Sequence, residues 1–195
     1  MSFIIGLTGP TGSGKSTACR YAESLGWLVV DCDKVARETT ENPEALEALT
    51  AVFGKEILSE DGKLNRKALA QKAFCTPENT ELLNATILPF IVALIKEKIK
   101  ESSSENILLD APTLYESGAD LLCDGVCVIT APSELRWGRI MARDNLTEEE
   151  ARLRMSAGKD DEFYKARTPH IIYNDGDEKT LIRKFNKILE DIGGI

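Results

Sequence analysis

The sequence predicts an α/β fold built on a parallel sheet, and three observations support this prediction. Short apolar runs alternate with stretches of helical periodicity along much of the 195 residues. Residues 9–17 read GPTGSGKST and match G-x-x-x-x-G-K-[ST] without a mismatch. An apolar run, FIIGLT, precedes this stretch and a helical pattern follows it over residues 17–25. Strand, glycine-rich loop and helix form the context in which this motif binds phosphate groups.

The chemistry of the loop follows from its residue types. Glycines allow the backbone to curl so that successive N–H groups point at an anion, and the helix that follows adds its dipole. Lys15 would lie against the β- and γ-phosphates of a nucleotide, and the Ser16 hydroxyl would ligate Mg²⁺. The expected nucleotide-binding residues of the loop are Gly12, Ser13, Gly14, Lys15, Ser16 and Thr17.

Five apolar runs are expected to form the strands of the sheet. They cover residues 3–8, 27–31, 106–110, 125–130 and 170–173. Helical segments between consecutive strands favour parallel pairing through right-handed crossovers. The sequence therefore predicts a three-layer, parallel-sheet core of the P-loop NTPase type.

The stretch from about residue 35 to residue 104 has no strand signal and is predicted to be a helical insertion. Thr76 and Pro77 form a typical N-cap and first-turn pair for a long apolar helix. Pro89 is expected to kink or break that helix. The run SSS at residues 102–104 ends it.

A second stretch, at about residues 136–167, is rich in arginine and lysine and is predicted to be a small helical lid. Within it, Thr147 and Glu150 have the spacing of a capping box. A basic helix pair inserted late in a nucleotide-binding core is typical of a lid. The core is then expected at about residues 1–34, 105–135 and 168–195 of one P-loop domain.

Bulk composition excludes several classes of protein. A net charge of −8 argues against nonspecific binding of nucleic acid. No run reaches the roughly 18 apolar residues of a membrane helix, and no basic segment precedes the first strand, so we expect neither membrane association nor a signal peptide. Five cysteines without framework spacing indicate reduced thiols and a cytoplasmic protein, and they do not suggest a zinc site.

Two carboxylates are expected at the carboxyl ends of strands, where open parallel sheets bind ligands. Asp33 follows the second strand and could orient an attacking hydroxyl group; alternatively, it only caps the following helix at residues 34–39. Asp110 ends the third strand and could hold Mg²⁺ directly or through water; alternatively, it is a solvated turn residue before Pro112.

Two arginines of the predicted lid share one helix face. Arg139 and Arg143 are four residues apart, so both guanidinium groups could clamp phosphate oxygens and offset transition-state charge. The alternative is pairing with nearby acids on the surface, such as Asp144. After the fifth strand, Asn174 begins an N-D-G turn that could contact a nucleotide base.

Over nearly its whole length, the chain resembles the dephospho-coenzyme A kinase family. The glycine-rich loop is one element of the resemblance, and VDCDKVAR at residues 30–37 resembles the family's D-x-D-x-x-A-R segment. DAPTLYESG at residues 110–118 is similar to D-x-P-L-L-F-E-x-G. Residues 139–151 resemble the R-x-x-x-R-D-x-L-T-x-E-E-A lid, and residues 172–176 resemble the V-I-x-N-x-G ending. The lid and the D-x-D-x-x-A-R segment are more specific than the loop.

The resemblance implies a nucleotide-kinase-like fold and the last step of coenzyme A synthesis. ATP, with Mg²⁺ on Ser16 and Asp110, would phosphorylate the ribose 3′-hydroxyl of dephospho-coenzyme A. The catalytic residues would then be Lys15, Asp33 and Arg139. Arg37 and Asp33 would contact the acceptor, Arg143 the phosphates, and Asn174 the adenine end of the nucleotide.

The sequence departs from the family pattern in the acceptor and lid segments. Leu88 stands where the family often has histidine, Thr113 where it has leucine, and Gly158 where it often has glutamine. These departures concern the acceptor pocket and lid contacts more than the reaction type. The expected partners are ATP and dephospho-coenzyme A, with the chain a monomer or weak homo-oligomer.

Two alternative functions are compatible with parts of the pattern. One is another small-molecule kinase of the same fold, acting on a nucleoside or nucleotide. The other, from a different class, is a nucleotide-dependent switch. The sequence argues against the switch, because it has no N-K-x-D segment for reading guanine and because a basic lid serves no purpose in a switch.

Overall fold

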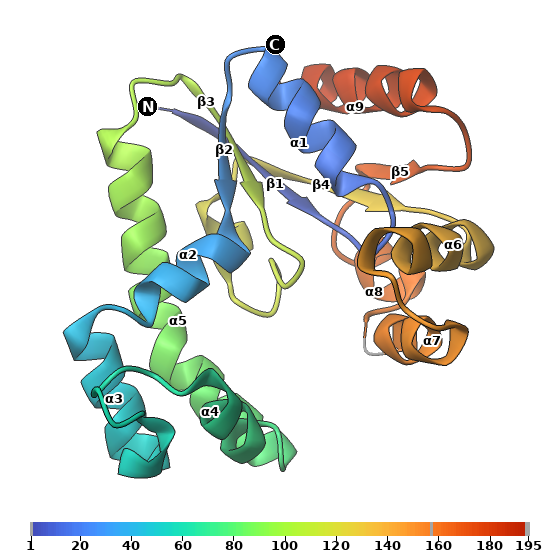
Figure 1. Ribbon diagram of the computed structural model, residues 1–195. Coiled ribbons are helices and arrows are strands. Elements are labelled where there is room, and N and C mark those ends of the chain that lie inside the picture. Colours follow the sequence, from blue (N-terminus) through green and yellow to red (C-terminus); the bar gives the residue numbers. More distant parts are fainter. Residues whose placement is uncertain (1, 157, 194–195) are drawn as a thin grey trace. The chain divides into compact units, whose positions relative to one another are not determined.

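A computed structural model of the protein describes residues 2–156 and 158–193, and Figure 1 shows its elements. The strands within those residues are β1 (Phe3–Thr8), β2 (Leu28–Asp31), β3 (Asn106–Asp110), β4 (Gly125–Thr130) and β5 (Ile171–Tyr173). They form one sheet in the order β2-β3-β1-β4-β5, in which β1 pairs parallel with β3 and β4, and β4 pairs parallel with β5. The predicted α/β class with a parallel sheet is confirmed.

The helices follow the predicted alternation, with small shifts at their ends. They are α1 (Lys15–Ser24), α2 (Cys32–Thr39), α3 (Pro43–Phe53), α4 (Arg66–Ala73), α5 (Pro77–Glu101), α6 (Ser133–Asp144), α7 (Glu148–Ser156), α8 (Asp161–Lys165) and α9 (Glu178–Ile192), with short 3₁₀ turns η1 (Lys55–Ile57) and η2 (Ala119–Leu122). Helix α1 begins two residues earlier than predicted, directly after Gly14, whose φ is 110°. Strand β5 begins one residue later than predicted, because His170 is outside the ladder.

The chain forms two compact units. One contains residues 1–30 and 103–195, and the other contains residues 31–102. The first unit holds the sheet, the loop and helices α6 to α9. The second is helical.

The core of the first unit lies between the sheet and helices α1 and α9, which cover the same face (Figure 1). Ile5 and Leu7 of β1 point to this face because alternate residues of a strand share a side. Phe185 and Leu189 of α9 are fully buried against it. On the opposite face, a side chain at Gly6 would meet Leu114 at 2.6 Å, so the segment after β3 packs closely there.

The second unit has its own core between α3, η1, α4 and α5. Its buried members are Ala45, Leu49, Phe53, Ile57, Leu69, Ala73 and Ile87. Helix α5 begins as predicted: the Thr76 side chain accepts a hydrogen bond from the backbone N–H of Asn79 at 3.2 Å, and Pro77 occupies the first turn.

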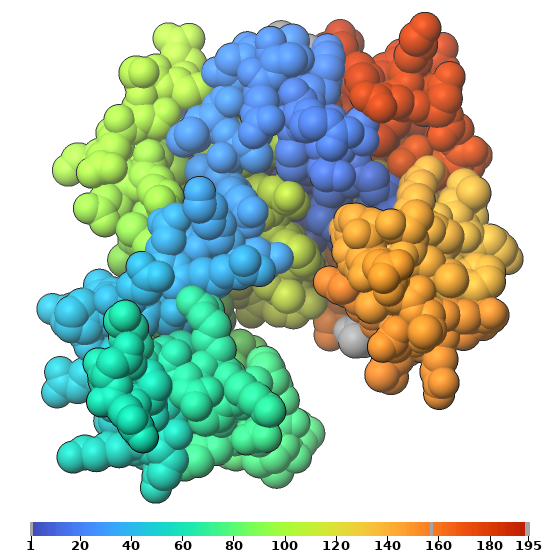
Figure 2. All heavy atoms as spheres, viewed as in Figure 1, coloured from blue at the N-terminus to red at the C-terminus, as the bar shows by residue number. Residues whose placement is uncertain are grey.

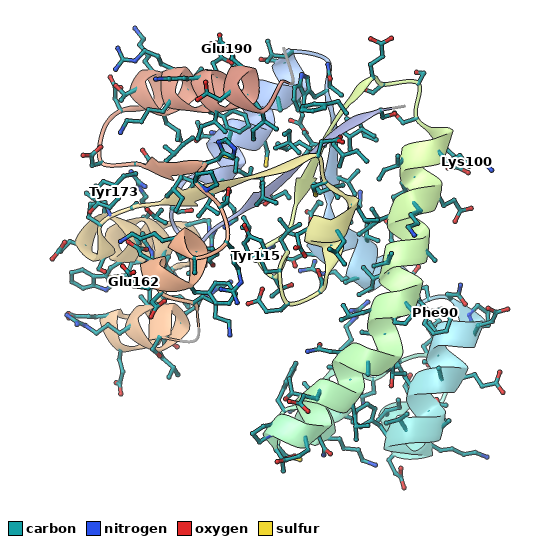
Figure 3. All side chains as sticks on the ribbon, turned by 180° about the vertical axis from the view of Figure 1, so that it is seen from behind. Phe90, Lys100, Tyr115, Glu162, Tyr173 and Glu190 are labelled. Carbon is teal, nitrogen blue, oxygen red and sulfur yellow. The ribbon has the colours of Figure 1, made fainter. Side chains whose placement is uncertain are left out.

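Pro89 lies inside α5, which continues for twelve residues beyond it to Glu101. The predicted break is therefore wrong. The predicted kink is present, because Figure 3 shows the helix changing direction close to the labelled Phe90. Proline removes one backbone donor and its ring crowds the preceding turn, which bends a helix that packing on both sides still holds together.

The predicted lid region contains three helices rather than a pair. Helices α6, α7 and α8 lie together near the end of the sheet at which β4 finishes (Figure 1). The capping box is confirmed: the backbone N–H of Thr147 donates to Glu150 Oε2 at 2.8 Å, and the N–H of Glu150 donates to Thr147 Oγ1 at 3.4 Å. Local pairing of this kind depends on sequence spacing alone, which explains why it was predictable.

Within residues 2–156 and 158–193, no helix is long and apolar enough to cross a membrane. All five cysteines carry free thiols. Cys19 and Cys127 are buried, whereas Cys75 is exposed.

The packing of α9 gives a stability prediction. Leu189→Ala should lower the free energy of unfolding by about 2–5 kcal/mol, because Leu189 is fully buried and its loss leaves a cavity. Leu121→Ala makes the same chemical change at a side chain that is 86% exposed and should alter stability by less than about 0.5 kcal/mol. Urea denaturation of both variants measures the difference; equal losses would contradict this account of the core.

Candidate active site

The loop between β1 and α1 has a backbone that requires glycine at several positions. Gly9, Gly12 and Gly14 have φ angles of 135°, 78° and 110°, which L-residues with a side chain rarely adopt. There is also no room for a side chain at Gly9 or Gly14. A Cβ at Gly9 would clash with the backbone carbonyl of Ile129, and one at Gly14 would meet Asn174 Nδ2 at 2.5 Å. The motif glycines thus allow β4 and the turn after β5 to pack against the loop.

Lys15 begins α1 and folds back over the loop. Its ammonium group donates to the carbonyl of Gly9 at 2.7 Å and is 3.4 Å from the carbonyl of Pro10. The side chain is half-buried. Its charge therefore lies on the loop itself, where a bound polyphosphate would also lie.

Side chains from distant parts of the sequence reach the next carbonyls. Arg139 of α6 donates to the carbonyl of Gly12 at 3.2 Å and is 3.5 Å from that of Ser13. Asn174, 5% exposed, donates from Nδ2 to the carbonyl of Ser13 at 2.7 Å. Arg136, also of α6, donates to the carbonyl of Thr11 at 3.0 Å. The structure thus brings Arg139 and Asn174 together at the loop, whereas the sequence had suggested a contact of Asn174 with the nucleotide base.

Arg136 was not among the residues singled out from the sequence. The one available signal was its place among the basic residues that begin the predicted lid. Nothing in the local pattern distinguishes a buried arginine from an exposed one on a helix rich in charge.

Ser16 and Asp110 supply oxygen atoms near the start of α1 and the end of β3. Ser16 is exposed, and Asp110 is half-buried in register with Leu7 of β1. The Cys19 thiol is 3.4 Å from Asp110 Oδ2. Burial and, next, the carboxylate of Asp110 raise the pKa of the Cys19 thiol, so it stays protonated and donates. Asp110 is the last residue of β3 and its Oδ1 is buried, so the alternative of a solvated turn residue is wrong.

Asp33 and Arg37 belong to the second unit, on helix α2. The helix is capped by Asp31, whose side chain accepts from the N–H of Lys34 at 3.0 Å. The alternative in which Asp33 caps this helix is therefore wrong, because the helix begins at Cys32 and Asp33 lies in its first turn. Asp33 and Arg37 are both exposed and are four residues apart, which places them on one face of α2.

Arg143 is paired with its neighbour in the lid region. Its guanidinium makes two hydrogen bonds to Asp144, at 2.8 and 2.7 Å, and Arg154 binds the same carboxylate at 2.7 Å. These hydrogen bonds raise the pKa of Arg143 and lower that of Asp144. Two guanidinium groups therefore converge on one carboxylate, an arrangement that would suit a phosphate group equally well.

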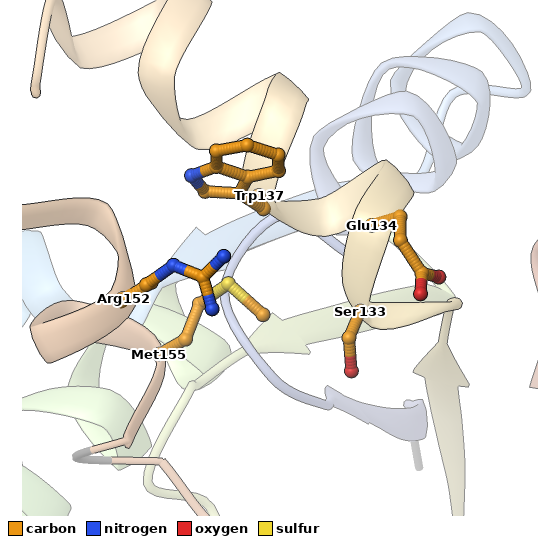
Figure 4. Close-up of a pocket in the computed structure, with 5 residues that line it drawn as sticks. All are labelled: Ser133, Glu134, Trp137, Arg152 and Met155. Atoms are coloured by element: carbon orange, nitrogen blue, oxygen red, sulfur yellow. The ribbon is translucent and has the colours of Figure 1, made fainter. Parts of the chain in front are cut away.

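A pocket of about 360 Å³ lies between α6 and α7 (Figure 4). Its lining is Ser133, Glu134, Trp137, Arg152 and Met155. The Arg152 guanidinium carbon lies 5.3 Å from the centre of the Trp137 ring. Ala151 is the one buried residue of α7 among those described, so α7 is held on α6 by few apolar contacts. In Figure 2 the surface of these helices adjoins that of the loop region.

A glycine loop between the first strand and first helix of a parallel sheet, with lysine and arginine on its carbonyls, defines a P-loop protein of the kinase type. A model of the dephospho-CoA kinase family matches residues 3–180. The chain therefore belongs to the dephospho-CoA kinase family.

Individual relatives agree with this assignment. The chain is 35% identical over 194 residues to dephospho-CoA kinase of Enterococcus faecalis, covering 98% of both chains. It is 40% identical over 184 residues to that of Corynebacterium diphtheriae, covering 92% of both. Dephospho-CoA kinase from Campylobacter jejuni has a similar solved structure, with a TM-score of 0.67, 31% identity and 98% of both chains covered. A Thermus thermophilus protein superimposes with a TM-score of 0.83, at 33% identity and 99% coverage of both chains.

The contact between Asn174 and the loop gives a testable prediction. Asn174→Asp replaces the amide donor with a carboxylate that cannot donate to the Ser13 carbonyl at pH 7. We expect the free energy of unfolding to fall by about 1–3 kcal/mol. The loss should shrink as pH falls, because a protonated carboxyl group donates again and burial favours that form.

The control for this prediction is the neighbouring residue. Asp175 is exposed and pairs with Lys184 at 3.2 Å, so Asp175→Asn should have little effect. Denaturation of both variants and the parent from pH 5 to pH 8 measures the difference at each pH. A loss in Asn174→Asp that does not change with pH would refute the hydrogen-bonding role.

Proposed function

We propose that this protein transfers the γ-phosphoryl group of ATP to the ribose 3′-hydroxyl group of dephospho-CoA, giving CoA and ADP. The observation that carries the proposal is the family match over residues 3–180, which includes the phosphate loop, the acidic segments and the basic lid segment together. The contacts of the loop with Lys15 and Arg139 support it, because phosphoryl transfer depends on positioning and on neutralising charge.

The loop would bind the phosphates, and Ser16 and Asp110 would hold Mg²⁺. Both residues offer oxygen atoms, which Mg²⁺ prefers, and Ser16 is exposed. Among the described residues there is no group of three or more acidic, histidine or cysteine side chains arranged to hold a metal. A site in which the protein supplies only Ser16 and Asp110 would suit Mg²⁺ that arrives with the nucleotide and keeps several of its waters. The ion would neutralise charge on the phosphates, while Lys15 would move from the loop carbonyls to the same oxygens.

Asp33 would orient the 3′-hydroxyl group and accept its proton, and Arg37 would help to hold the acceptor. Their exposure on one face of α2 supports this role, because both side chains are available to a ligand. Residues 31–102 would then form the acceptor-binding part of the enzyme. Leu88, which replaces the histidine common in the family, is half-buried in α5 and would contribute an apolar surface there.

Residues 136–167 would act as the lid, and Arg139 and Arg143 would bind phosphate oxygens when it closes. The scarcity of buried residues in α7 supports such a movement, because few apolar contacts oppose it. Arg143 would exchange Asp144 for a phosphate group, and the exposure of the arginine side chain, 58%, keeps the cost of that exchange small. Closure would exclude water and so prevent wasteful hydrolysis of ATP.

Product analysis tests the proposed function directly. The protein is incubated with ATP, Mg²⁺ and dephospho-CoA, with adenosine and other nucleosides as parallel acceptors, and the products are separated by chromatography. We expect rapid and selective formation of CoA. If ADP forms with one of the nucleosides and not with dephospho-CoA, the protein is a kinase for a different small molecule. ADP that forms equally without any acceptor would instead indicate a hydrolytic switch.

Asp33→Asn tests the proposed catalytic role, and Asp31→Asn is its matched control. The amide cannot accept the proton, so kcat should fall by about 10²–10⁴-fold while ATP still binds. Asp31→Asn makes the same change two residues earlier. Asparagine caps helices as well as aspartate does, so α2 should be preserved and kcat should change little. Near-normal turnover in Asp33→Asn would rule out the proposed role.

A further inference from the structure

The carbonyl groups of the phosphate loop share one property: each of the five from residue 9 to residue 13 accepts a hydrogen bond from a side chain, or lies within 3.5 Å of a side-chain donor. Lys15 serves Gly9 and Pro10, Arg136 serves Thr11, Arg139 serves Gly12 and Ser13, and Asn174 also serves Ser13. Of these donors, Arg136 is the one to which the proposed reaction gives no task.

Arg136 is held differently from Arg139. Its residue is 8% exposed, and its Nε donates to the Thr11 carbonyl at 3.0 Å. A Cβ at Gly12 would lie 2.8 Å from the Arg136 carbonyl oxygen, so the backbone of α6 also presses against the loop at this point. Both the side chain and the backbone of Arg136 are therefore packed against the loop.

Helix α8 carries a carboxylate near Arg136. Burial lowers the pKa of the Arg136 guanidinium, and the nearby carboxylate of Asp161 opposes that effect. Asp161 begins α8, whose start is capped by Asp160 through a 2.8 Å hydrogen bond to the N–H of Phe163. Tyr164 of the same helix is 3% exposed.

An aromatic cluster anchors α8 to the segment after β3. The ring centres of Phe163 and Tyr115 are 6.0 Å apart in an edge-to-face arrangement, and the Arg167 guanidinium carbon lies 3.7 Å from the centre of the Phe163 ring. Figure 3 shows Tyr115 on the side of that segment that faces α8. The helix that carries Asp161 is thus anchored to the rest of this unit.

A fixed carbonyl orients the next N–H group. The peptide unit is planar and trans, so the carbonyl of one residue and the N–H of the next point in opposite directions. If the Thr11 carbonyl is held toward Arg136, the N–H of Gly12 must point the other way, toward the interior of the loop where a phosphate binds. Lys15 and Arg139 would leave their carbonyls to reach phosphate groups, whereas Arg136 would stay.

We propose that Arg136 is a positioning residue that holds the Thr11 carbonyl and thereby aims the Gly12 N–H group at the phosphates of the bound nucleotide. This inference rests on the proposed function only in that the loop must bind a nucleotide. Packing alone gives no reason for a buried guanidinium here, because apolar residues of similar volume often stabilise a fold equally well.

Calorimetric titration with ADP and with ATP tests the proposal without any acceptor. Arg136→Met keeps the volume and removes the donor, and we expect the Kd for both nucleotides to rise about tenfold, equivalent to about 1.4 kcal/mol. The melting temperature should change by a few degrees at most. Arg136→Lys keeps a cationic donor and should recover part of the affinity. Arg183→Met, on the exposed side of α9, is the matched control and should bind as the parent does.

Steady-state kinetics add a measurement that a purely structural role would not change. In Arg136→Met the KM for ATP should rise while the KM for dephospho-CoA stays within about twofold. An unchanged Kd for ADP in a folded Arg136→Met variant overturns the proposal. If that variant does not fold, Arg136→Leu, which also removes the donor, takes its place: parental affinity for ADP in the folded variant overturns the proposal, and weakened ADP binding supports it. The two proposals can fail separately. If the parent forms no CoA but Arg136→Met still binds ADP more weakly than the parent does, the proposed function is refuted and the positioning role stands.

Discussion

The direction of the loop's backbone groups is the constraint on which the rest of this protein depends. A loop that binds polyphosphate must turn its N–H groups inward, and planar peptide units then turn its carbonyls outward. Outward carbonyls in a partly buried loop need donors. The protein supplies them from α1, from α6 and from the turn after β5, through Lys15, Arg136, Arg139 and Asn174. The order of the sheet makes this possible, because β1 lies between β3 and β4, with β5 next to β4.

These donors divide into two groups by their burial. In the proposed reaction, the buried donors would stay on the loop carbonyls, and the more exposed ones would leave them for the phosphates. Arg136 and Asn174 are almost fully buried and donate to carbonyls that face away from the ligand. Lys15 and Arg139 are half-buried, and Arg143 is largely exposed on an ion pair with Asp144. A charged group can offset the developing charge of a phosphoryl group only where it lies against the ligand. One helix, α6, carries both kinds, since Arg136 lies one turn before Arg139.

Sequence predicted the parts of the site that depend on local geometry. The loop, the Thr76 cap and the Thr147 capping box each lie within a few residues, so spacing and residue type determined them. Local sequence did not decide which of two acids caps α2. Asp31 and Asp33 are both close to the start of the helix, and the structure has Asp31 as the N-cap. The predicted break at Pro89 was wrong because packing of α5 along its length outweighs the lost hydrogen bond. Arg136 was missed because its burial depends on α6 meeting a loop 125 residues away.

The proposed lid region is packed closely at its base and loosely beyond it. At the base, Arg136 and Ile140 of α6 are buried, and α8 is anchored by aromatic contacts to Tyr115. Helix α7 lies beside a pocket and is held on α6 by the ion pair of Arg154 with Asp144 and by the contact of Arg152 with the Trp137 ring. Such contacts are individually weak and are easily exchanged. In the proposed lid, a movement of α7 would therefore leave the contact of Arg136 with the Thr11 carbonyl in place, since that contact belongs to α6.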